Sequence, residues 1–274
     1  MQYDPIKQRL SDFIRNQPVL KILFFKVLRV LFLREWYVRS VLFRLFPDKK
    51  PARILDAGCG FGQYSYLMST RFPGATIDSV DLNPAHVSAL SDFAGRLNLN
   101  INPSVQDLTT YTSQDSYDLI LCVDVIEHIE NDRAVFSNFA RSLSPGGEVV
   151  ISTPSDQGGS DHHHDHDHEH QGVHGFIDEH ARDGYSITDL KEKLETAGLV
   201  VADIRYTYGA FGSFAWKLAV KWPMMLLNLS MALVLLLPFY FLITLIPILL
   251  LHQADMMVRW KRGTGLIARA IKPN

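Results

Sequence analysis

Short apolar runs alternate with segments of helical period through the middle of the chain, a pattern typical of a parallel α/β sheet. The pattern predicts strands at residues 53–56, 76–80, 101–105, 118–123, 148–152, 200–206 and 265–271. It predicts helices at residues 62–71, 84–97, 132–143 and 187–197. Asn83 before Pro84 is typical of a helix start, because Asn caps the first turn and Pro suits it.

The first 50 residues have the pattern of a basic amphipathic helix, broken near its middle. Lys and Arg fill one arc of the helix, and Glu35 intrudes on the apolar stripe. The stripe comprises Leu20, Phe24, Val27, Leu28, Leu31, Val38, Leu42, Leu45 and Phe46. Such a helix either lies in a membrane interface with its cations near anionic head groups, or covers the core of its own domain. Basic residues interrupt every apolar run, which excludes a signal peptide.

The most apolar stretch lies near the other end of the chain. Residues 224–251 contain no charged residue over 28 positions, more than the roughly 20 residues that span a bilayer. Pro238 and Pro247 interrupt this stretch. The pattern therefore predicts a membrane-inserting helical hairpin that bends near Pro238 and is re-entrant or half-inserted. Two full crossings become available if residues 211–222 insert as well.

Charge is segregated along the chain. Residues 1–50 hold 11 Lys/Arg against 4 Asp/Glu, residues 51–210 hold 9 against 24, and residues 211–274 hold 7 against 1. The formal net charge of −2 does not favour binding to nucleic acid. Two cysteines are too few for a disulfide framework. Two basic, apolar regions thus flank an acidic middle.

The sharpest motif is the glycine-rich loop that follows the first predicted strand. Asp56 precedes glycines at alternate positions, Gly58, Gly60 and Gly62. A nicotinamide-dinucleotide loop reads G-x-G-x-x-G instead, and an acid beside it would repel a pyrophosphate. The spacing here favours S-adenosylmethionine, whose amino-acid end is cationic.

Two more acids end successive strands. Asp81 follows the second strand and can accept both hydroxyls of a ribose, and Asp107 follows the third and can accept from an adenine amino group. Each alone is also consistent with a solvated acid. Together they indicate a ligand, because ligands bind at the carboxyl ends of such strands.

With these motifs, residues 52–210 resemble the class I S-adenosylmethionine-dependent methyltransferases, and within them the small-molecule branch that includes ubiquinone-biosynthesis O-methyltransferases. The matching motifs are Asp56–Gly62, Asp81-Leu82, Gln106-Asp107, Cys122–His128 and Leu143–Glu148. The resemblance implies a Rossmann-like sheet of seven strands whose last strand is antiparallel and lies between the fifth and sixth. The predicted hairpin is then an insertion between strands six and seven, so both of its ends lie on one side of the membrane.

The resemblance also implies which residues bind S-adenosylmethionine. The methionine end falls on Asp56, Ala57, Gly58, Cys59, Gly60 and Gly62. The ribose falls on Asp81, and the adenine falls near Leu82, Gln106, Asp107 and Leu108. The sulfonium falls near Cys122, Val123 and Asp124.

Candidates for a general base or for acceptor contact follow the fourth and fifth strands. They are His128, His180 and Tyr185, each of which also has a structural interpretation. Glu127 and His128 are alternatively candidates for a divalent ion, as in some ubiquinone-type relatives.

A histidine-rich run of low complexity follows the fifth strand. It contains His162, His163, His164, His166, His168 and His170, interleaved with acids. Imidazoles and carboxylates can bind Zn²⁺ or Ni²⁺, but the irregular spacing favours a solvated loop over a shaped metal site.

We therefore expect a basic N-terminal region (residues 1–50), a methyltransferase domain (51–210 and 263–274) and a membrane-associated insertion (211–262). The expected enzyme methylates an amphipathic or lipid-linked acceptor, with oxygen favoured, from the cytoplasmic face of a membrane, where the methyl donor is found. It has no nucleic-acid partner. Two alternatives are a non-catalytic membrane adaptor that binds metal through the histidine run, and an NAD-dependent oxidoreductase, which the glycine spacing disfavours.

Overall fold

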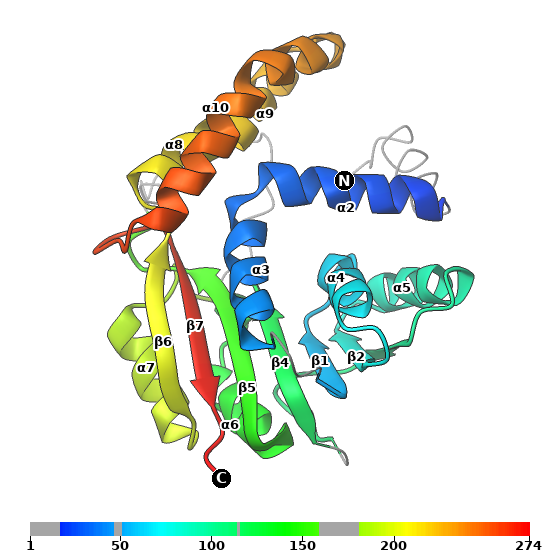
Figure 1. Cartoon of the computed structure of the whole chain (residues 1–274), viewed down its shortest axis with the longest axis vertical. Coiled ribbons are helices and arrows are strands. Elements are labelled where there is room, and N and C mark those ends of the chain that lie inside the picture. The colour runs from blue at the N-terminus through cyan, green and yellow to red at the C-terminus, as the bar shows by residue number, and fades with distance from the viewer. Residues whose placement is uncertain (1–16, 47–50, 114–115, 159–180) are drawn as a thin grey trace, which may run out of the picture.

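The computed structural model describes residues 17–46, 51–113, 116–158 and 181–274, and its centre is a sheet of seven strands (Figure 1). The strands are β1 (Arg53–Ala57), β2 (Thr76–Asp81), β3 (Ile101–Val105), β4 (Tyr117–Val123), β5 (Leu143–Pro154), β6 (Val200–Thr207) and β7 (Gly265–Ile271). Their order is β3-β2-β1-β4-β5-β7-β6. The first five strands are parallel, and β7 is antiparallel to both of its neighbours. The fold class predicted for the sheet is therefore confirmed, including the place of the last strand.

Helices cover both faces of this sheet. On one face α6 (Asp132–Ser142) and α7 (Ile187–Thr196) pack over β4, β5 and β7 through residues such as Phe136, Phe139 and Leu190. On the other face α4 (Gln63–Arg71) and α5 (Pro84–Arg96) pack through Leu67, Met68 and Phe93. The two hydrophobic clusters leave the carboxyl edge of the parallel strands to the connecting loops.

The N-terminal region forms two helices, α2 (Pro18–Leu31) and α3 (Leu33–Leu45), which meet at the extended residue Phe32. In α2 the predicted apolar stripe stays partly exposed. Phe24 and Val27, both on the predicted stripe, are about two-fifths exposed, whereas Lys21 and Phe25 are buried. The ammonium of Lys21 lies 4.6 Å from the centre of the Phe93 ring, so a cation-π contact accommodates the buried charge.

In α3, which packs on the sheet, residues of the predicted apolar stripe are buried. Val38 and Leu42 are buried in the same cluster as α4, and Glu35, the intruder on the stripe, is buried with them. The two interpretations of the N-terminal region thus apply to different helices: α3 covers the domain core, and α2 leaves apolar side chains exposed. The division of the chain at residue 50 stays a prediction.

An apolar arm of helices connects β6 to β7 and projects away from the sheet (Figure 1). The ascending limb is α8 (Ala210–Trp216), a π-helical turn (Lys217–Lys221) and α9 (Trp222–Leu229), and the descending limb is α10 (Leu237–Met257). A 3-10 segment, Met231–Leu236, joins the limbs. The chain therefore turns at residues 230–236. This turn lies just before Pro238, near which the sequence predicts the bend, and Pro238 itself lies in the first turn of α10, where proline is tolerated.

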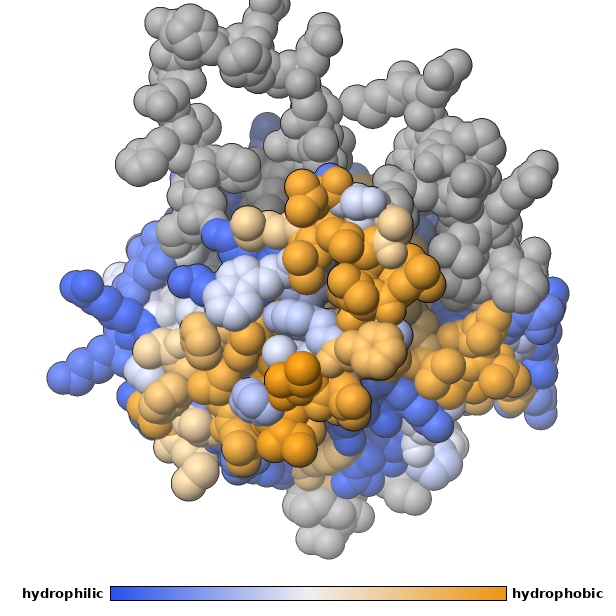
Figure 2. All heavy atoms as spheres, turned by 90° about the horizontal axis from the view of Figure 1, so that it is seen from above, coloured by the Kyte–Doolittle hydropathy of each residue, from blue (hydrophilic) through white to orange (hydrophobic). Residues whose placement is uncertain are grey.

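The arm is apolar on its outside. Leu229, Leu242 and Ile243 are at least three-quarters exposed, and apolar side chains cover much of the face seen along the arm from its tip (Figure 2). One helical segment of the described chain, Ala232–Met257, is long and apolar enough to cross a membrane, and 6% of its most apolar window is buried. Exposed apolar patches of this kind mark interaction surfaces.

Candidate functional site

The glycine loop lies between β1 and α4 and turns through three glycines with positive φ angles. Gly58 has a φ of +80°, and a Cβ there would lie 2.2 Å from the Val125 side chain, so no other residue fits. Around Gly60, by contrast, an added Cβ meets nothing within 4 Å. The loop is thus packed from behind at Gly58 and leaves open space beside the backbone at Gly60, where a ligand can approach closely.

Asp81 at the end of β2 closes over this loop. Its Oδ2 accepts a hydrogen bond from the Gly60 backbone N–H at 2.8 Å, and its Oδ1 accepts from the Asn83 N–H at 2.8 Å. Leu82 next to it is 65% exposed, a large apolar side chain on the surface. Such a pair suits a nucleoside, because the carboxylate can accept hydrogen bonds from the ribose hydroxyls and the apolar side chain can contact the nucleobase. The structure brings together Gly60, Asp81 and Leu82, as the motifs predict.

Asp56 takes a different place from the one predicted for it. Its carboxylate is 2% exposed and accepts a hydrogen bond from the Ser65 hydroxyl, which in turn lies 2.9 Å from the Ser79 hydroxyl. Burial raises the pKa of Asp56 to about 7. The side chain therefore holds the loop to α4 and β2 from inside the fold and does not face the open side of the loop.

The loop after β3 carries the residues predicted to contact adenine. Asp107 is exposed, and its Oδ1 accepts from both the backbone N–H and the hydroxyl of Thr109, each at 2.8 Å. Gln106 is exposed too, whereas Leu108 is buried in the core beneath them. One carboxylate oxygen of Asp107 orders its own loop, and the other is not used in a hydrogen bond with a described residue.

The end of β4, predicted to lie near the sulfonium, is joined to the N-terminal helices. Cys122 is fully buried and Val123 half-buried, and Asp124 has a φ of +51°, which is rare for a residue with a side chain. The carboxylate of Asp124 forms an ion pair with Arg34 of α3. The backbone N–H of Arg34 donates to the Tyr208 hydroxyl at 2.9 Å. Strained backbone at such a position is typical of functional sites.

Arg34 and Tyr208 are the site residues that the sequence analysis missed. Arg34 falls on the polar arc of the N-terminal pattern, and Tyr208 follows β6, far from every motif. The one available signal was Glu35, an acid within an apolar stripe. Burial raises the pKa of the Glu35 carboxyl, and the neighbouring Tyr64 and Arg34 oppose that rise.

The residues predicted as a general base or for acceptor contact have different surroundings. His128 is exposed in a single 3-10 turn, Ile126–His128, directly after β4. Glu127 before it is buried, accepts from the Thr153 hydroxyl at 3.1 Å, and has its pKa raised by burial. The structure favours a structural role for Tyr185, which is fully buried and donates to Asp132 at 2.7 Å.

Several predicted site residues lie outside the described residues. These are His180 and the histidines of the low-complexity run, His162, His163, His164, His166, His168 and His170. Among the residues that the structure does describe, no group of three His, Cys, Asp or Glu side chains is arranged to hold a metal ion.

Comparison with known proteins agrees with this fold and loop. The profile of a methyltransferase domain family matches residues 32–204. Malonyl-(acyl-carrier protein) O-methyltransferase 1 of Ilyobacter polytropus is 33% identical over 106 residues, and ubiquinone biosynthesis O-methyltransferase of Coxiella burnetii is 30% identical over 105. These matches cover 39% and 38% of this chain, and 39% and 44% of the two relatives.

Solved structures share the architecture. Phosphoethanolamine N-methyltransferase 2 of Haemonchus contortus, in complex with S-adenosyl-L-methionine, aligns with a TM-score of 0.60 at 19% identity, over 96% of this chain and 60% of that one. The O-methyltransferase from a trans-AT PKS multienzyme of Brevibacillus brevis aligns with a TM-score of 0.53 at 16% identity, over 90% and 79%. At these identities the likeness concerns the fold alone.

The fold and the glycine loop together define a class I S-adenosylmethionine-dependent methyltransferase domain. The matched profile spans well over half of the chain, so the chain belongs to the methyltransferase domain family. The sequence prediction of such a methyltransferase is confirmed at the level of the family.

Proposed function

We propose that this protein is a membrane-anchored enzyme that transfers the methyl group of S-adenosylmethionine to oxygen on an amphipathic or lipid-linked acceptor. The observation that carries this proposal is the place of the apolar arm. β6 runs parallel to β5, because both are antiparallel to β7. The arm therefore leaves the sheet at the same edge that carries the glycine loop, and an acceptor held in a membrane would meet the donor there.

The residues around the glycine loop fit the donor. Open space beside Gly60 admits the methionine end, Asp81 offers its carboxylate to the ribose, and exposed Leu82 offers an apolar surface to the base. When bound, S-adenosylmethionine supplies a methyl group activated by a sulfonium. The contribution of the chain is then to orient the two reactants and to exclude water.

A hydroxyl acceptor needs a base, and we assign this role to His128. It is the exposed histidine directly after β4, where the resemblance places the sulfonium. The names of two relatives as O-methyltransferases support oxygen as the acceptor atom.

The lengths of the arm support partial insertion. Beyond Lys221 the ascending limb has eight helical residues, about 12 Å at 1.5 Å per residue. The part of α10 before His252, residues 237–251, is about 22 Å long on the same scale, short of the roughly 30 Å hydrocarbon core. A hairpin that enters one leaflet and returns keeps β6 and β7 on one side. The basic flanks of the arm support a cytoplasmic position for that side.

Methyl transfer to a lipid extract tests this proposal. The full chain, reconstituted in vesicles, is incubated with donor labelled in its methyl group and with a total lipid extract. Label in the organic phase that disappears with Asp81→Ala supports the enzyme. Donor binding without turnover, together with stoichiometric Zn²⁺ uptake, would instead favour the metal-binding adaptor. No donor binding at millimolar concentration would overturn the proposal.

A further inference from the structure

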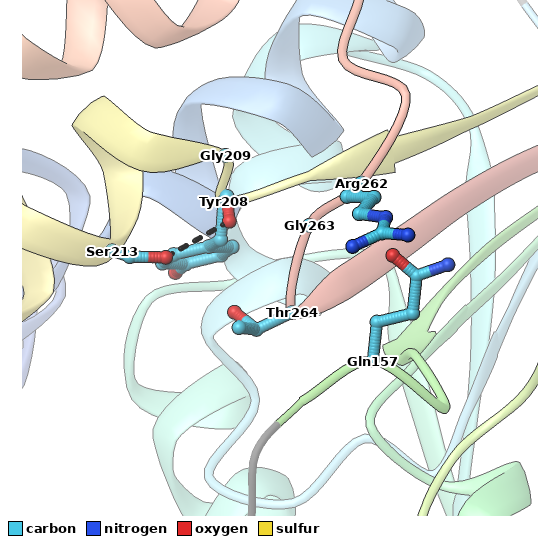
Figure 3. Close-up of a pocket in the computed structure, with 7 residues that line it drawn as sticks. All are labelled: Gln157, Tyr208, Gly209, Ser213, Arg262, Gly263 and Thr264. Atoms are coloured by element: carbon cyan, nitrogen blue, oxygen red, sulfur yellow. Dashed lines mark hydrogen bonds between the residues drawn. The ribbon is translucent and has the colours of Figure 1, made fainter.

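An open pocket of about 420 Å³ lies at the base of the apolar arm, separate from the glycine loop (Figure 3). Its lining comes from four places: the segment after β5, the end of β6, the start of α8 and the segment before β7. The lining residues are Gln157, Tyr208, Gly209, Ser213, Arg262, Gly263 and Thr264. No predicted site residue is among them.

The walls of the pocket are set by close backbone packing. A Cβ at Gly209 would lie 2.0 Å from the Trp260 ring, and a Cβ at Gly263 would lie 2.3 Å from the Thr207 carbonyl oxygen. The Ser213 hydroxyl donates to the Tyr208 carbonyl at 3.0 Å, which fixes the start of α8 against β6. The shape of this pocket therefore follows from the fold and not from a chance arrangement of surface side chains.

The side chains at its mouth are those that recognise an anion. The guanidinium of Arg262 and the amide of Gln157 point toward one another across the opening (Figure 3). Arg262 forms no ion pair with a described residue, and the Nε2 of Gln157 donates to the Tyr206 hydroxyl at 2.8 Å, which orients the amide. Burial and the nearby Asp156 raise the pKa of Tyr206, and Arg262 opposes that rise. Asp156 and Arg262 therefore both lie close to this opening.

The pocket also lies where the arm changes from polar to apolar. Trp216 and Trp222 are each about two-fifths exposed on the ascending limb, with Lys217 and Lys221 between them. Aromatic and basic residues in this order are typical of the interface between water and a bilayer. Residues 204–254 contain no Asp or Glu, and the one acid of the arm, Asp255, is fully buried, so no exposed acid on the arm opposes an anionic surface.

The pocket is connected to the donor edge through two side chains. Tyr208, which lines it, accepts a hydrogen bond from the backbone of Arg34, and Arg34 pairs with Asp124. A group held in the pocket would thus be linked to the end of β4 through Tyr208 and Arg34.

We propose that this pocket binds the phosphate of a lipid headgroup, through Arg262 and Gln157, while the acyl chains lie along the apolar arm. The inference rests on the membrane anchoring proposed above and adds the chemical class of the lipid. Arginine suits this role because its planar fork matches phosphate oxygens, whereas lysine acts as a point charge.

Vesicle binding of the full chain tests the inference. Vesicles of phosphatidylcholine carry either phosphatidic acid or a fatty acid at matched surface charge, and the bound fraction is measured after sedimentation. We expect a preference for phosphatidic acid that Arg262→Ala reduces about tenfold, as for loss of a charged hydrogen-bonding group. Gln157→Leu, which changes no charge, should reduce the same preference. Lys261→Ala, the matched control, should weaken binding to both vesicles equally.

Inorganic phosphate distinguishes the two sources of the anion. Competition by millimolar phosphate that Arg262→Ala abolishes supports a pocket that recognises phosphate itself. If free phosphate does not change the preference for phosphatidic acid, the result supports recognition of the headgroup within the membrane surface. Equal effects of Arg262→Ala and Lys261→Ala, or no effect of Gln157→Leu, would overturn the inference. If the wild-type protein binds none of the vesicles, the result would contradict the proposed membrane anchoring instead.

Discussion

The guanidinium of Arg34, at the start of α3, forms an ion pair with the carboxylate of Asp124, at the end of β4. This pair joins the N-terminal helices to the edge of the sheet where the family resemblance places a sulfonium. A guanidinium and a sulfonium that both lie beside the Asp124 carboxylate repel each other. We therefore expect the N-terminal region to influence binding of the methyl donor.

We predict that Arg34→Gln strengthens binding of S-adenosylmethionine relative to S-adenosylhomocysteine. The first carries a sulfonium charge and the second does not, so removing the guanidinium favours only the first. Both side chains are about one-third exposed, which limits the effect to about threefold. Calorimetry with both ligands measures the ratio, and Lys26→Gln on the exposed face of α2 is the control. Equal weakening of both ligands would show that Arg34 contacts the part they share.

Asp81→Ala should weaken donor binding by about tenfold to a hundredfold. The variant loses the acceptor for the ribose hydroxyls and releases the Gly60 N–H from its hydrogen bond; hydrogen bonds to a charged group contribute about 1.5–3 kcal/mol each. Isothermal titration measures the affinity. Asp92→Ala, which removes an exposed acid on α5, should bind normally, and loss of binding in both variants would point to a general charge effect.

Tyr37→Phe should loosen the attachment of the arm. The Tyr37 hydroxyl donates at 2.9 Å to the Oδ2 of Asp255, and the Oδ1 of that fully buried acid accepts from the Gly212 N–H at 2.8 Å. Losing one buried hydrogen bond lowers the free energy of unfolding by about 1–3 kcal/mol. Urea denaturation in detergent measures this, with Tyr66→Phe on α4 as the control. Unchanged stability would mean that apolar packing alone holds the arm.

The stability of the fold should depend on pH through Asp56. Burial raises the pKa of this carboxyl from 3.8 to about 7 in the folded state, so its contribution is complete below pH 3.8 and is lost as the pH rises to about 7. Asp56→Asn keeps an oxygen that accepts from Ser65 but cannot ionise. Relative to wild type, its free energy of unfolding should therefore rise between pH 4 and pH 7. Urea titrations across that range, with Asp92→Asn as a flat reference, test the sign.

Local patterns were sufficient to predict the sheet. Several strands are short apolar runs between turn residues, whereas β3 alternates apolar and polar residues, and both β3 and β7 begin and end at the predicted residues. Periodicity does not say which face of a helix the fold covers, and the buried face of α2 carries Lys21 and Phe25, which lie outside the predicted apolar stripe. The turn of the arm falls a few residues before Pro238, because α9 already ends at Ser230.

The candidate site was predictable where its residues lie at the ends of successive parallel strands. The glycine loop and Asp81 follow from residues at strand ends, and the structure places them together. Arg34 and Tyr208 are 174 residues apart and meet only through the tertiary fold. No spacing rule connects a helix before the sheet with the end of its sixth strand.

The position of β7 has a consequence for how the protein is made. This strand fills the gap between β5 and β6, yet it is synthesised only after the whole apolar excursion has left the ribosome. Until then β5 and β6 expose unpaired edges, a state prone to aggregation. The sheet can thus close only after the whole apolar arm has been synthesised, so completion of the methyltransferase domain depends on a segment that follows the arm in the chain.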